Sequence, residues 1–507
     1  MESFTRVTRI DNIPLKEVFL WHTREGAFER LNPPWQPFTV IERKGGVQNN
    51  GVVKIRMMGF GPLRMKWVVK HSDYIEGKQF RDVQVSGLFS SWTHTHLFEP
   101  FGSSSCQLQD HIEYSLPGGP LGGLIARNLV NKKLQKIFDY RHRITEQDLH
   151  NHHSIINKTI RRKDDKPSMT IAITGSSGFI GSSLIPFLTT GGHKVIRLLR
   201  RRPNPDESTA SVQSIRWNPS SSSSESIGVP SSKTDDNNRT IINAVVNLAG
   251  ENVFGRWTKE KKKRILESRV NTTKSLCKAL ASLDKPPQIL VSASATGYYG
   301  DRGNEILTED SSTSSTTAAS PNTTTSSSSS STSPSINFLS EVSSQWEEAT
   351  QVAKEAGIRV VNLRIGVVLS ASGGILAKIL IPFKMGFGGN IGDGNQYISW
   401  IALDDLLGII LHVIADESLI GPINAVAPNP VSNSDFTKIL GKVLSRPTIF
   451  SIPKFIIKAA LGEQLADALL LSSSRVMPIR LTKTSRYQFR FPYLDLALRH
   501  TLGKSIS

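Results

Sequence analysis

The chain has 507 residues, and its 61 basic and 43 acidic side chains give it a formal net charge of +18. At about 150 residues per domain, this length predicts two to four domains. The basic residues are scattered and no recognition module is found, which excludes a nucleic-acid partner from our expectations. No apolar run is long enough to span a bilayer, and two cysteines cannot form a disulfide framework, so we expect a cytoplasmic protein without a transmembrane segment.

The first 150 residues alternate short apolar stretches with glycine, proline and aspartate turns, which predicts an α+β domain. A helical region over 18–31 ends at Asn32-Pro33-Pro34. An amphipathic helix is expected over 124–143. The strands predicted between these helices cover residues 52–56, 65–69, 80–85, 91–98 and 107–114.

Three segments of this region carry a resemblance to a known family. They are residues 21–35, 92–100 and 140–143. They resemble the polyketide-cyclase/START-like domain, which in some family members precedes an epimerase-like domain. The resemblance implies a helix-grip fold enclosing a cavity for an apolar ligand.

His94 and His96 stand two apart on one of these strands and therefore share a face with Trp92 and Phe98. Such a pair could bind a metal ion or line a packed interior. Since no third ligand follows at a recognisable spacing, the sequence favours packing, and we expect no metal site.

Residues 151–168 are polar and charged and are predicted to be a linker. From residue 169 onward strands alternate with helices, which predicts a doubly wound parallel sheet. Its first strand, 169–173, leads directly into a glycine-rich turn and then a helix. The turn reads Thr174-Gly175-Ser176-Ser177-Gly178-Phe179-Ile180-Gly181. Glycines at a strand-to-helix turn let a pyrophosphate approach the backbone and the helix N-terminus, so a dinucleotide site is predicted here.

The spacing G-x-x-G-x-x-G resembles the short-chain dehydrogenase/reductase superfamily in its extended, epimerase-like branch. The second strand, 193–199, ends in Arg200, Arg201 and Arg202 instead of an acidic residue. Arginines suit a ribose 2′-phosphate, which favours NADP over NAD. A solvated basic turn is the alternative.

Further motifs resemble one subfamily, the epimerase-like proteins often labelled nucleoside-diphosphate-sugar epimerase or cell-division inhibitor. They cover residues 244–273, 292–300, 346–347, 363–370, 399–406, 421–428 and 476–498. The domain is expected to span 169–507, with a family-specific segment at about 451–500. Two polar, serine-rich insertions, at about 203–238 and 311–335, are expected to be disordered.

The resemblance assigns roles to individual residues. The expected cofactor contacts are Gly175, Ser176, Ser177, Gly178, Phe179, Ile180, Gly181, Arg200, Arg201, Leu248, Ala249, Gly250 and Ser292. Relatives pair a catalytic Ser with a Tyr-x-x-x-Lys motif. Ser294 matches the Ser, but the Tyr-x-x-x-Lys is absent from residues 338–347. Tyr298 or Tyr299 could replace its tyrosine as proton donor, and the alternative is that both are packing or cofactor-lining aromatics.

Three functions follow from these patterns. The first is an NADP-dependent oxidoreductase or epimerase acting on a small hydroxylated or sugar-like substrate. The second is a non-catalytic NADP(H)-binding regulator, which the missing Tyr-x-x-x-Lys favours. The third is a carrier of an apolar ligand through the N-terminal domain. The oligomeric state is left open.

Overall fold

A computed structural model describes residues 1–506 except 59–63, 103, 118, 160–167, 220–240 and 314–333. The chain divides into two units. Unit 1 comprises Met1–Asp165, Pro186–Gly192 and Arg499–Ser507, and unit 2 comprises Lys166–Ile185 and His193–Leu498. Among the described residues, no helix combines the length and apolarity that crossing a membrane requires.

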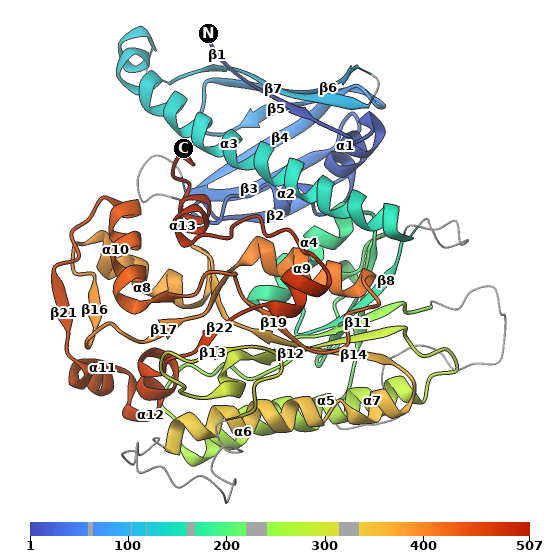
Figure 1. The fold of residues 1–507 in the computed structure, drawn as a ribbon. Helices are drawn as coiled ribbons and strands as arrows, with labels where there is room; N and C mark the ends of the chain where they lie inside the picture. Colours follow the sequence, from blue (N-terminus) through green and yellow to red (C-terminus); the bar gives the residue numbers. More distant parts are fainter. Residues whose placement is uncertain are drawn as a thin grey trace, which may run out of the picture. The chain divides into compact units, whose positions relative to one another are not determined.

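Unit 1 contains a seven-stranded antiparallel sheet of order β1-β7-β6-β5-β4-β3-β2 (Figure 1). Its strands are β1 (Glu2–Ile10), β2 (Phe38–Lys44), β3 (Val52–Met58), β4 (Arg64–Ile75), β5 (Gln79–Ser86), β6 (Ser91–Phe101) and β7 (Ser105–Ser115). Strands β2 to β7 each pair with their sequence neighbour, while β1 closes onto β7. Side chains on β6 and β7 alternate between buried and half-buried, as strands with one covered face do.

The covered face of this sheet packs against helices. The helices of unit 1 are α1 (Leu15–Thr23), α2 (Ala27–Arg30) and α3 (Gly119–Thr159), and α3 runs along the sheet in Figure 1. Val130, Leu134 and Phe138 of α3 form one buried cluster with Trp92 of β6 and Tyr114 of β7. The cluster explains why a 41-residue helix with a modest apolar stripe is stable: its stripe is covered by the sheet.

The structure corrects three expectations for this region. Strands β1 and β2 were missed because more than half of their residues are polar or charged, and β2 ends in three consecutive charged residues. The predicted helix at 18–31 is two helices, separated at Gly26, whose φ of +94° only glycine adopts readily. The predicted linker is wrong for 151–159, where α3 continues, and its remainder at 160–167 lies outside the described residues.

Unit 2 contains a seven-stranded parallel sheet of order β10-β9-β8-β11-β12-β14-β19. Its strands are β8 (Thr170–Thr174), β9 (Lys194–Leu199), β10 (Val212–Arg216), β11 (Ala244–Asn247), β12 (Ile289–Ala295), β14 (Arg359–Ile365) and β19 (Gly421–Ala425). This is the Rossmann-like doubly wound order, in which the chain reverses direction across the sheet between β8 and β11. Ligands bind such sheets outside the carboxyl ends of the strands at that reversal.

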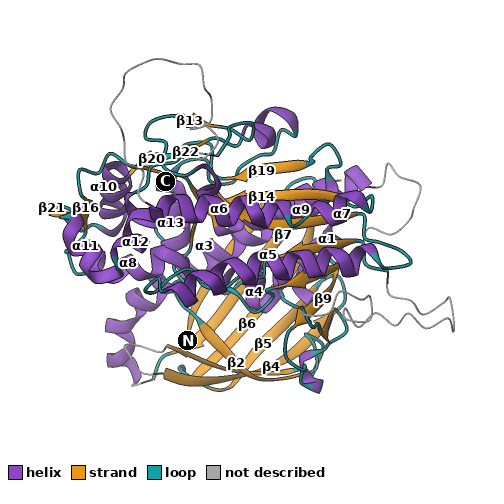
Figure 2. Ribbon diagram, turned by 90° about the horizontal axis from the view of Figure 1, so that it is seen from below, coloured by secondary structure: helices purple, strands orange, loops and turns teal. Residues whose placement is uncertain are grey.

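Helices cover both faces of this sheet, and Figure 2 shows them in purple beside the strands. The α-helices that begin in unit 2 are α4 (Phe179–Thr190), α5 (Lys259–Ala281), α6 (Pro334–Glu348), α7 (Gln351–Glu355), α8 (Gly374–Lys384), α9 (Leu403–Ala415), α10 (Asn433–Leu444), α11 (Lys454–Leu461), α12 (Glu463–Ala466) and α13 (Leu494–Leu502). Helices α5 and α6 lie side by side. Four two-stranded ladders complete the unit: β13 (Ile306–Leu307) with β22 (Arg475–Val476), β15 (Val367–Leu369) with β18 (Trp400–Ala402), β16 (Gly389–Ile391) with β21 (Phe450–Ile452), and β17 (Tyr397–Ile398) with β20 (Val431–Ser432).

The expectation of a disordered insertion over 203–238 is wrong for its first part. Residues 205–207 form a short 3-10 helix, and β10 is the edge strand of the parallel sheet. Two side chains of β10, Val212 and Ser214, are buried. This small buried surface is enough to order the strand because an edge strand pairs with only one neighbour, here β9. Residues 220–240 and 314–333, where the rest of the two insertions falls, lie outside the described residues.

Candidate functional site

The glycine turn lies at the carboxyl end of β8, beside the carboxyl end of β11. Gly175 has a φ of +65°, and a Cβ there would stand 2.5 Å from the Leu248 carbonyl oxygen. A Cβ on Gly181 would stand 2.4 Å from the Gly175 carbonyl oxygen. Only glycine therefore lets the turn close against β11 and lets α4 begin directly beneath it.

Gly178 differs from these two packed glycines, because a Cβ there would meet only the Gly175 carbonyl oxygen, at 3.1 Å. Gly178 and Ser177 are exposed, and the turn leads into the N-terminus of α4. The Ser176 hydroxyl is buried and has no hydrogen-bond partner among the described residues. An open glycine, an unsatisfied hydroxyl and a helix N-terminus together fit the phosphates of a dinucleotide.

Phe179 and Ile180 are half-buried at the start of α4. The Phe179 ring packs against Gly373, whose Cβ would stand 2.5 Å from the ring. Their side chains thus pack against the protein and hold the first turn of the helix in place. The groups of these two residues that remain available to a ligand are their backbone N–H groups.

The two arginines expected to bind the 2′-phosphate are placed differently. Arg200 directly follows β9 and is exposed. Arg201 pairs with Glu207 at 2.7 Å and also donates to the Arg202 carbonyl oxygen. Arg200 is therefore the arginine that can receive a phosphate without first breaking an ion pair.

Leu248, Ala249 and Gly250 continue from β11 beside the glycine turn, and none of them is buried. The guanidinium of Arg269 lies against Gly250, where a Cβ would stand 3.1 Å from its Cζ, and donates to the Glu251 carbonyl oxygen. Burial lowers the pKa of Arg269 to about 10, so this side chain is cationic at neutral pH.

Ser292 is not placed as expected for a cofactor contact. It is fully buried in β12, and its hydroxyl accepts a hydrogen bond from Asn247 at 3.2 Å. Asn247 also donates to Thr273 and accepts from Thr174. The Ser292 side chain therefore belongs to a hydrogen-bond chain that joins β8, β11 and β12 through Asn247, and it is not exposed.

Ser294 lies near the end of β12, 3% exposed, and its hydroxyl donates to Glu347 Oε1 at 2.7 Å. Glu347 comes from α6 and forms a bidentate pair with Arg364 of β14, with N–O distances of 2.8 and 2.9 Å. Burial alone would lower the pKa of Arg364, but the bonds to Glu347 raise it above its ordinary value. The Ser294 hydroxyl is thus engaged with the carboxylate of a buried ion pair.

The two tyrosines expected as proton donors differ in how far their side chains are buried. Tyr299 is fully buried, and its hydroxyl donates to Asn424 at 2.7 Å and accepts from Arg364 at 2.9 Å. Burial raises the pKa of Tyr299 to about 12. Tyr299 therefore cannot reach a substrate, and its assignment as proton donor is corrected. Tyr298 is half-buried and stacks under the Arg364 guanidinium, with 3.5 Å between Cζ and the ring centroid.

Sequence reasoning assigned no role to Glu347, Arg364 or Asn424. We name the group formed by Ser294, Glu347, Arg364, Tyr299 and Asn424 the unit 2 cluster. A signal was present, because Arg364 is a charged residue in a mostly apolar buried strand that also contains Asn362, and a buried charge requires a partner. The sequence does not say which acidic residue that partner is.

Two families match parts of the sequence. The NAD dependent epimerase/dehydratase family matches residues 171–332, and a domain of unknown function, DUF1731, matches residues 452–501. The epimerase family protein Mb2239 of Mycobacterium bovis is 35% identical over 329 residues, which is 65% of this chain and 96% of that protein.

Two solved structures are similar to the chain. A nucleoside-diphosphate sugar epimerase from Corynebacterium glutamicum has a TM-score of 0.73 and 33% identity, covering 99% of this chain and 90% of that one. Human epimerase family protein SDR39U1, isoform 2, solved with NADPH, has a TM-score of 0.53 and 30% identity. It covers 66% of this chain and 99% of the human chain. The bacterial similarity therefore extends through unit 1.

Proposed function

The chain belongs to the NAD dependent epimerase/dehydratase family, as a relative of SDR39U1, and we propose that its unit 2 binds NADP(H) across the carboxyl ends of β8 and β11. The observation that carries the proposal is the turn at Gly175–Gly181, with Gly178 open and the Ser176 hydroxyl buried without a partner. Human SDR39U1, solved with NADPH, supports the choice of cofactor.

Arg200 is proposed to select the phosphorylated cofactor. Fluorescence titration of the full chain should give a lower Kd for NADPH than for NADH, because Arg200 is exposed at the end of β9. Arg200→Glu should narrow or reverse this preference, and Arg202→Glu, also an exposed arginine, is the matched control. Equal affinity of the unaltered chain for both cofactors would contradict the proposal.

We propose that the chain is an oxidoreductase or epimerase that acts on a small hydroxylated or sugar-like substrate. A bound nicotinamide cofactor would supply hydride exchange with a substrate carbon. Tyr298 exchanges the proton with the substrate oxygen, since Ser294 and Tyr299 are buried and already hydrogen-bonded. Arg364, stacked on the Tyr298 ring, fixes the orientation of that ring.

A pair of variants tests this role. Tyr298→Phe should reduce turnover in a substrate screen followed at the nicotinamide absorbance, by roughly 10²-fold or more, while NADPH affinity stays unchanged. Tyr299→Phe removes the hydroxyl of the neighbouring tyrosine, which is hydrogen-bonded to Arg364. This variant should lower the free energy of unfolding and have a smaller effect on turnover than Tyr298→Phe. If a substrate is found and its turnover does not depend on Tyr298, the assignment fails.

A second candidate is a non-catalytic NADP(H)-binding regulator. Two observations favour it: the Tyr-x-x-x-Lys motif is absent, and the hydroxyl of Ser294 is committed to Glu347. Under this proposal, NADPH remains bound and unoxidised across a broad carbonyl and sugar-nucleotide screen, but changes the protease sensitivity of the chain. Turnover of any substrate in that screen would exclude it.

For unit 1 we propose a START-like helix-grip domain. Its antiparallel sheet with a long helix after the last strand supports the proposal, as do the motifs at 21–35 and 92–100. An apolar ligand carried in this domain should displace a fluorescent fatty-acid probe from the full chain. Absence of probe binding would contradict the carrier role but not the fold.

A further inference from the structure

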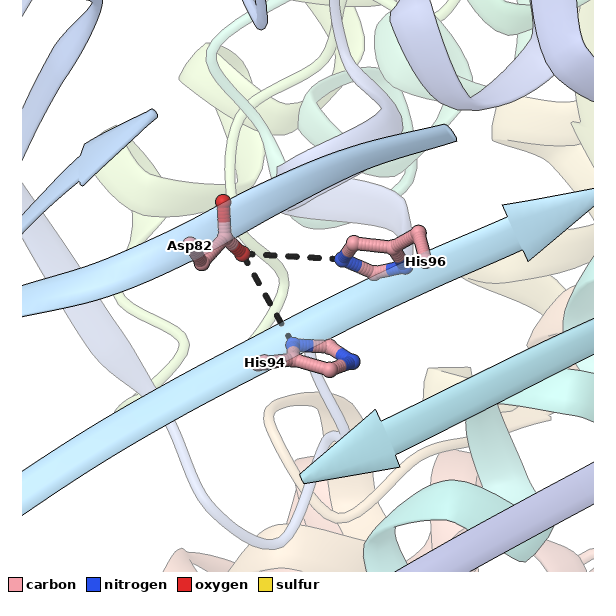
Figure 3. Close-up of side chains that lie close together, drawn as sticks. All are labelled: Asp82, His94 and His96. Atoms are coloured by element: carbon pink, nitrogen blue, oxygen red, sulfur yellow. Dashed lines mark ion pairs between the residues drawn. The ribbon is translucent and has the colours of Figure 1, made fainter. Parts of the chain in front are cut away.

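The covered face of the unit 1 sheet holds a buried group of histidines and aspartates. Asp82 of β5 lies directly opposite His94 of β6 in the strand register, and His96 follows two residues along the same face. Figure 3 shows both imidazoles turned toward the Asp82 carboxylate. Asp82 Oδ2 lies 3.7 Å from His94 Nδ1 and 3.5 Å from His96 Nε2. The side chains of His94 and His96 are only 4% and 7% exposed.

The opposite nitrogens of both rings are held by a second carboxylate. Asp110 Oδ1, on β7, lies 2.9 Å from His94 Nε2 and 2.6 Å from His96 Nδ1. Asp110 Oδ2 in turn contacts His142 Nε2 of α3 at 2.7 Å. His94 Nε2 is hydrogen-bonded to Asp110, and His96 Nδ1 lies at ion-pair distance from the same oxygen without hydrogen-bond geometry, so the other nitrogen of each ring is directed at Asp82.

Asp82 is oriented in the same way. Its Oδ1 contacts His71 Nδ1 of β4 at 2.6 Å, so its Oδ2 is the oxygen left facing His94 and His96. Two nitrogens and one oxygen thus converge, and these three ligand atoms all lie within 4.8 Å of one another. Ligands 2.0–2.1 Å from a tetrahedral zinc ion are about 3.4 Å apart, close to both measured nitrogen–oxygen separations.

We propose that Asp82, His94 and His96 form a binding site for a divalent transition metal ion, with Asp110 and His71 as the residues that orient the ligands. The carboxylate–histidine–metal arrangement is the usual one in proteins, because the outer carboxylate fixes the ring and its tautomer. Two imidazoles and one carboxylate suit Zn²⁺ or Fe²⁺ rather than Mg²⁺ or Ca²⁺, which prefer oxygen ligands. Three protein ligands leave a position for water or a substrate group.

The charges offer one competing explanation. The buried carboxylates of Asp82 and Asp110 interact electrostatically with the Arg141 guanidinium, and further positive charge beside them is stabilising. A proton can supply it: burial opposes this, but the charges and hydrogen bonds of Asp110 and Asp82 raise the pKa of His96 to about 9. The experiment must therefore distinguish a metal ion from a closed network of protonated histidine and carboxylate.

The test uses the full chain, treated with a chelator and dialysed, then titrated with Zn²⁺ while bound metal is measured by plasma mass spectrometry. We expect one high-affinity zinc per chain. Asp110→Asn should weaken zinc binding by roughly 10–100-fold, the usual loss for an outer-shell partner. His96→Asn should weaken it further. His111→Gln is the matched control, since His111 is a half-buried histidine of the neighbouring strand β7 that contacts Thr5 instead.

Equal zinc affinity in the unaltered chain and in folded His96→Asn would overturn the proposal, as would no uptake by the unaltered chain. If Asp110→Asn and His96→Asn both fail to fold, X-ray absorption spectroscopy on the zinc-loaded unaltered chain tests the proposal instead. A first shell with two imidazoles and an oxygen at about 2.0–2.2 Å supports the site. A shell with fewer than two imidazoles overturns it, because that zinc would occupy another place on the chain.

Discussion

Each unit buries a polar cluster, and the two clusters are balanced in opposite ways. In the unit 2 cluster, Arg364 and Glu347 neutralise each other through two hydrogen bonds, and Tyr299 satisfies a further donor of Arg364. In unit 1, Asp82 and Asp110 face imidazoles, whose charge depends on a bound proton or metal ion. An arginine keeps its charge over the physiological pH range and holds its carboxylate partner by two hydrogen bonds, whereas carboxylates facing imidazoles can respond to what is bound.

Of the variants considered for the two clusters, Glu347→Gln should cause the largest loss of unfolding free energy. It leaves the Arg364 guanidinium, 3% exposed, without its counter-charge, and breaking one side of such a buried pair costs roughly 3–5 kcal/mol. Denaturant unfolding of the full chain measures the loss. Glu348→Gln changes the exposed neighbour and should stay within roughly 0.5 kcal/mol. A Glu347 variant as stable as this control would mean that the pair does not hold the cluster together.

Gly178→Val should lower cofactor affinity at the glycine turn without destabilising the unit 2 cluster. We expect NADPH affinity to fall by at least a hundredfold, about 2.7 kcal/mol, because the side chain occupies the space left for the pyrophosphate. Stability should change little, since a Cβ at this position meets only one atom closely and the residue has no positive φ. Ser182→Ala, on the exposed side of α4, serves as control. Undiminished affinity would show that the turn is not the phosphate site.

Tyr299→Phe should cost roughly 1–3 kcal/mol of unfolding free energy, because Asn424 and Arg364 each lose a buried hydrogen-bond partner. Tyr298→Phe should leave stability nearly unchanged, since that side chain is only half-buried. Thermal melting of the two variants side by side makes the measurement. The reverse order of stabilities would contradict the closed network described for unit 2.

The smallest expected effect concerns additivity, and it rests on the metal site proposed for unit 1. Zinc should raise the melting temperature of Glu347→Gln by the same amount as that of the unaltered chain. Independent sites add within about 0.3–0.5 kcal/mol. A zinc effect that disappears in the Glu347 variant would mean that the two clusters are energetically coupled.

How far the sequence predicted these sites depends on how each sheet brings residues together. At a parallel sheet, ligand-binding residues sit at strand ends, and those of the first strand form one contiguous motif, which is why Gly175–Gly181 was found directly. The Rossmann-like fold was predicted on the same basis and is confirmed by the strand order and by the similar structures.

In the antiparallel sheet the information is spread across strands. Asp82 joins His94 only because β5 and β6 pair in one particular register, and sequence alone does not give that register. One signal was available: Asp110 occupies an inward position of β7 between Leu108 and Ile112. An inward aspartate in an apolar alternation predicts a buried partner, and here it would have pointed to the two histidines.

The pairing of β1 with β7 has a consequence for the order in which unit 1 forms. Strands β2 to β7 make a meander of local pairings, but Glu2 pairs with Tyr114 and Ile10 with Cys106. On a ribosome that adds about 5–20 residues per second, the first strand made therefore waits on the order of 10 s for its partner. Until β7 has been made, the backbone groups of β1 have no partner strand in this sheet, so β1 cannot join the sheet before its other strands have been synthesised.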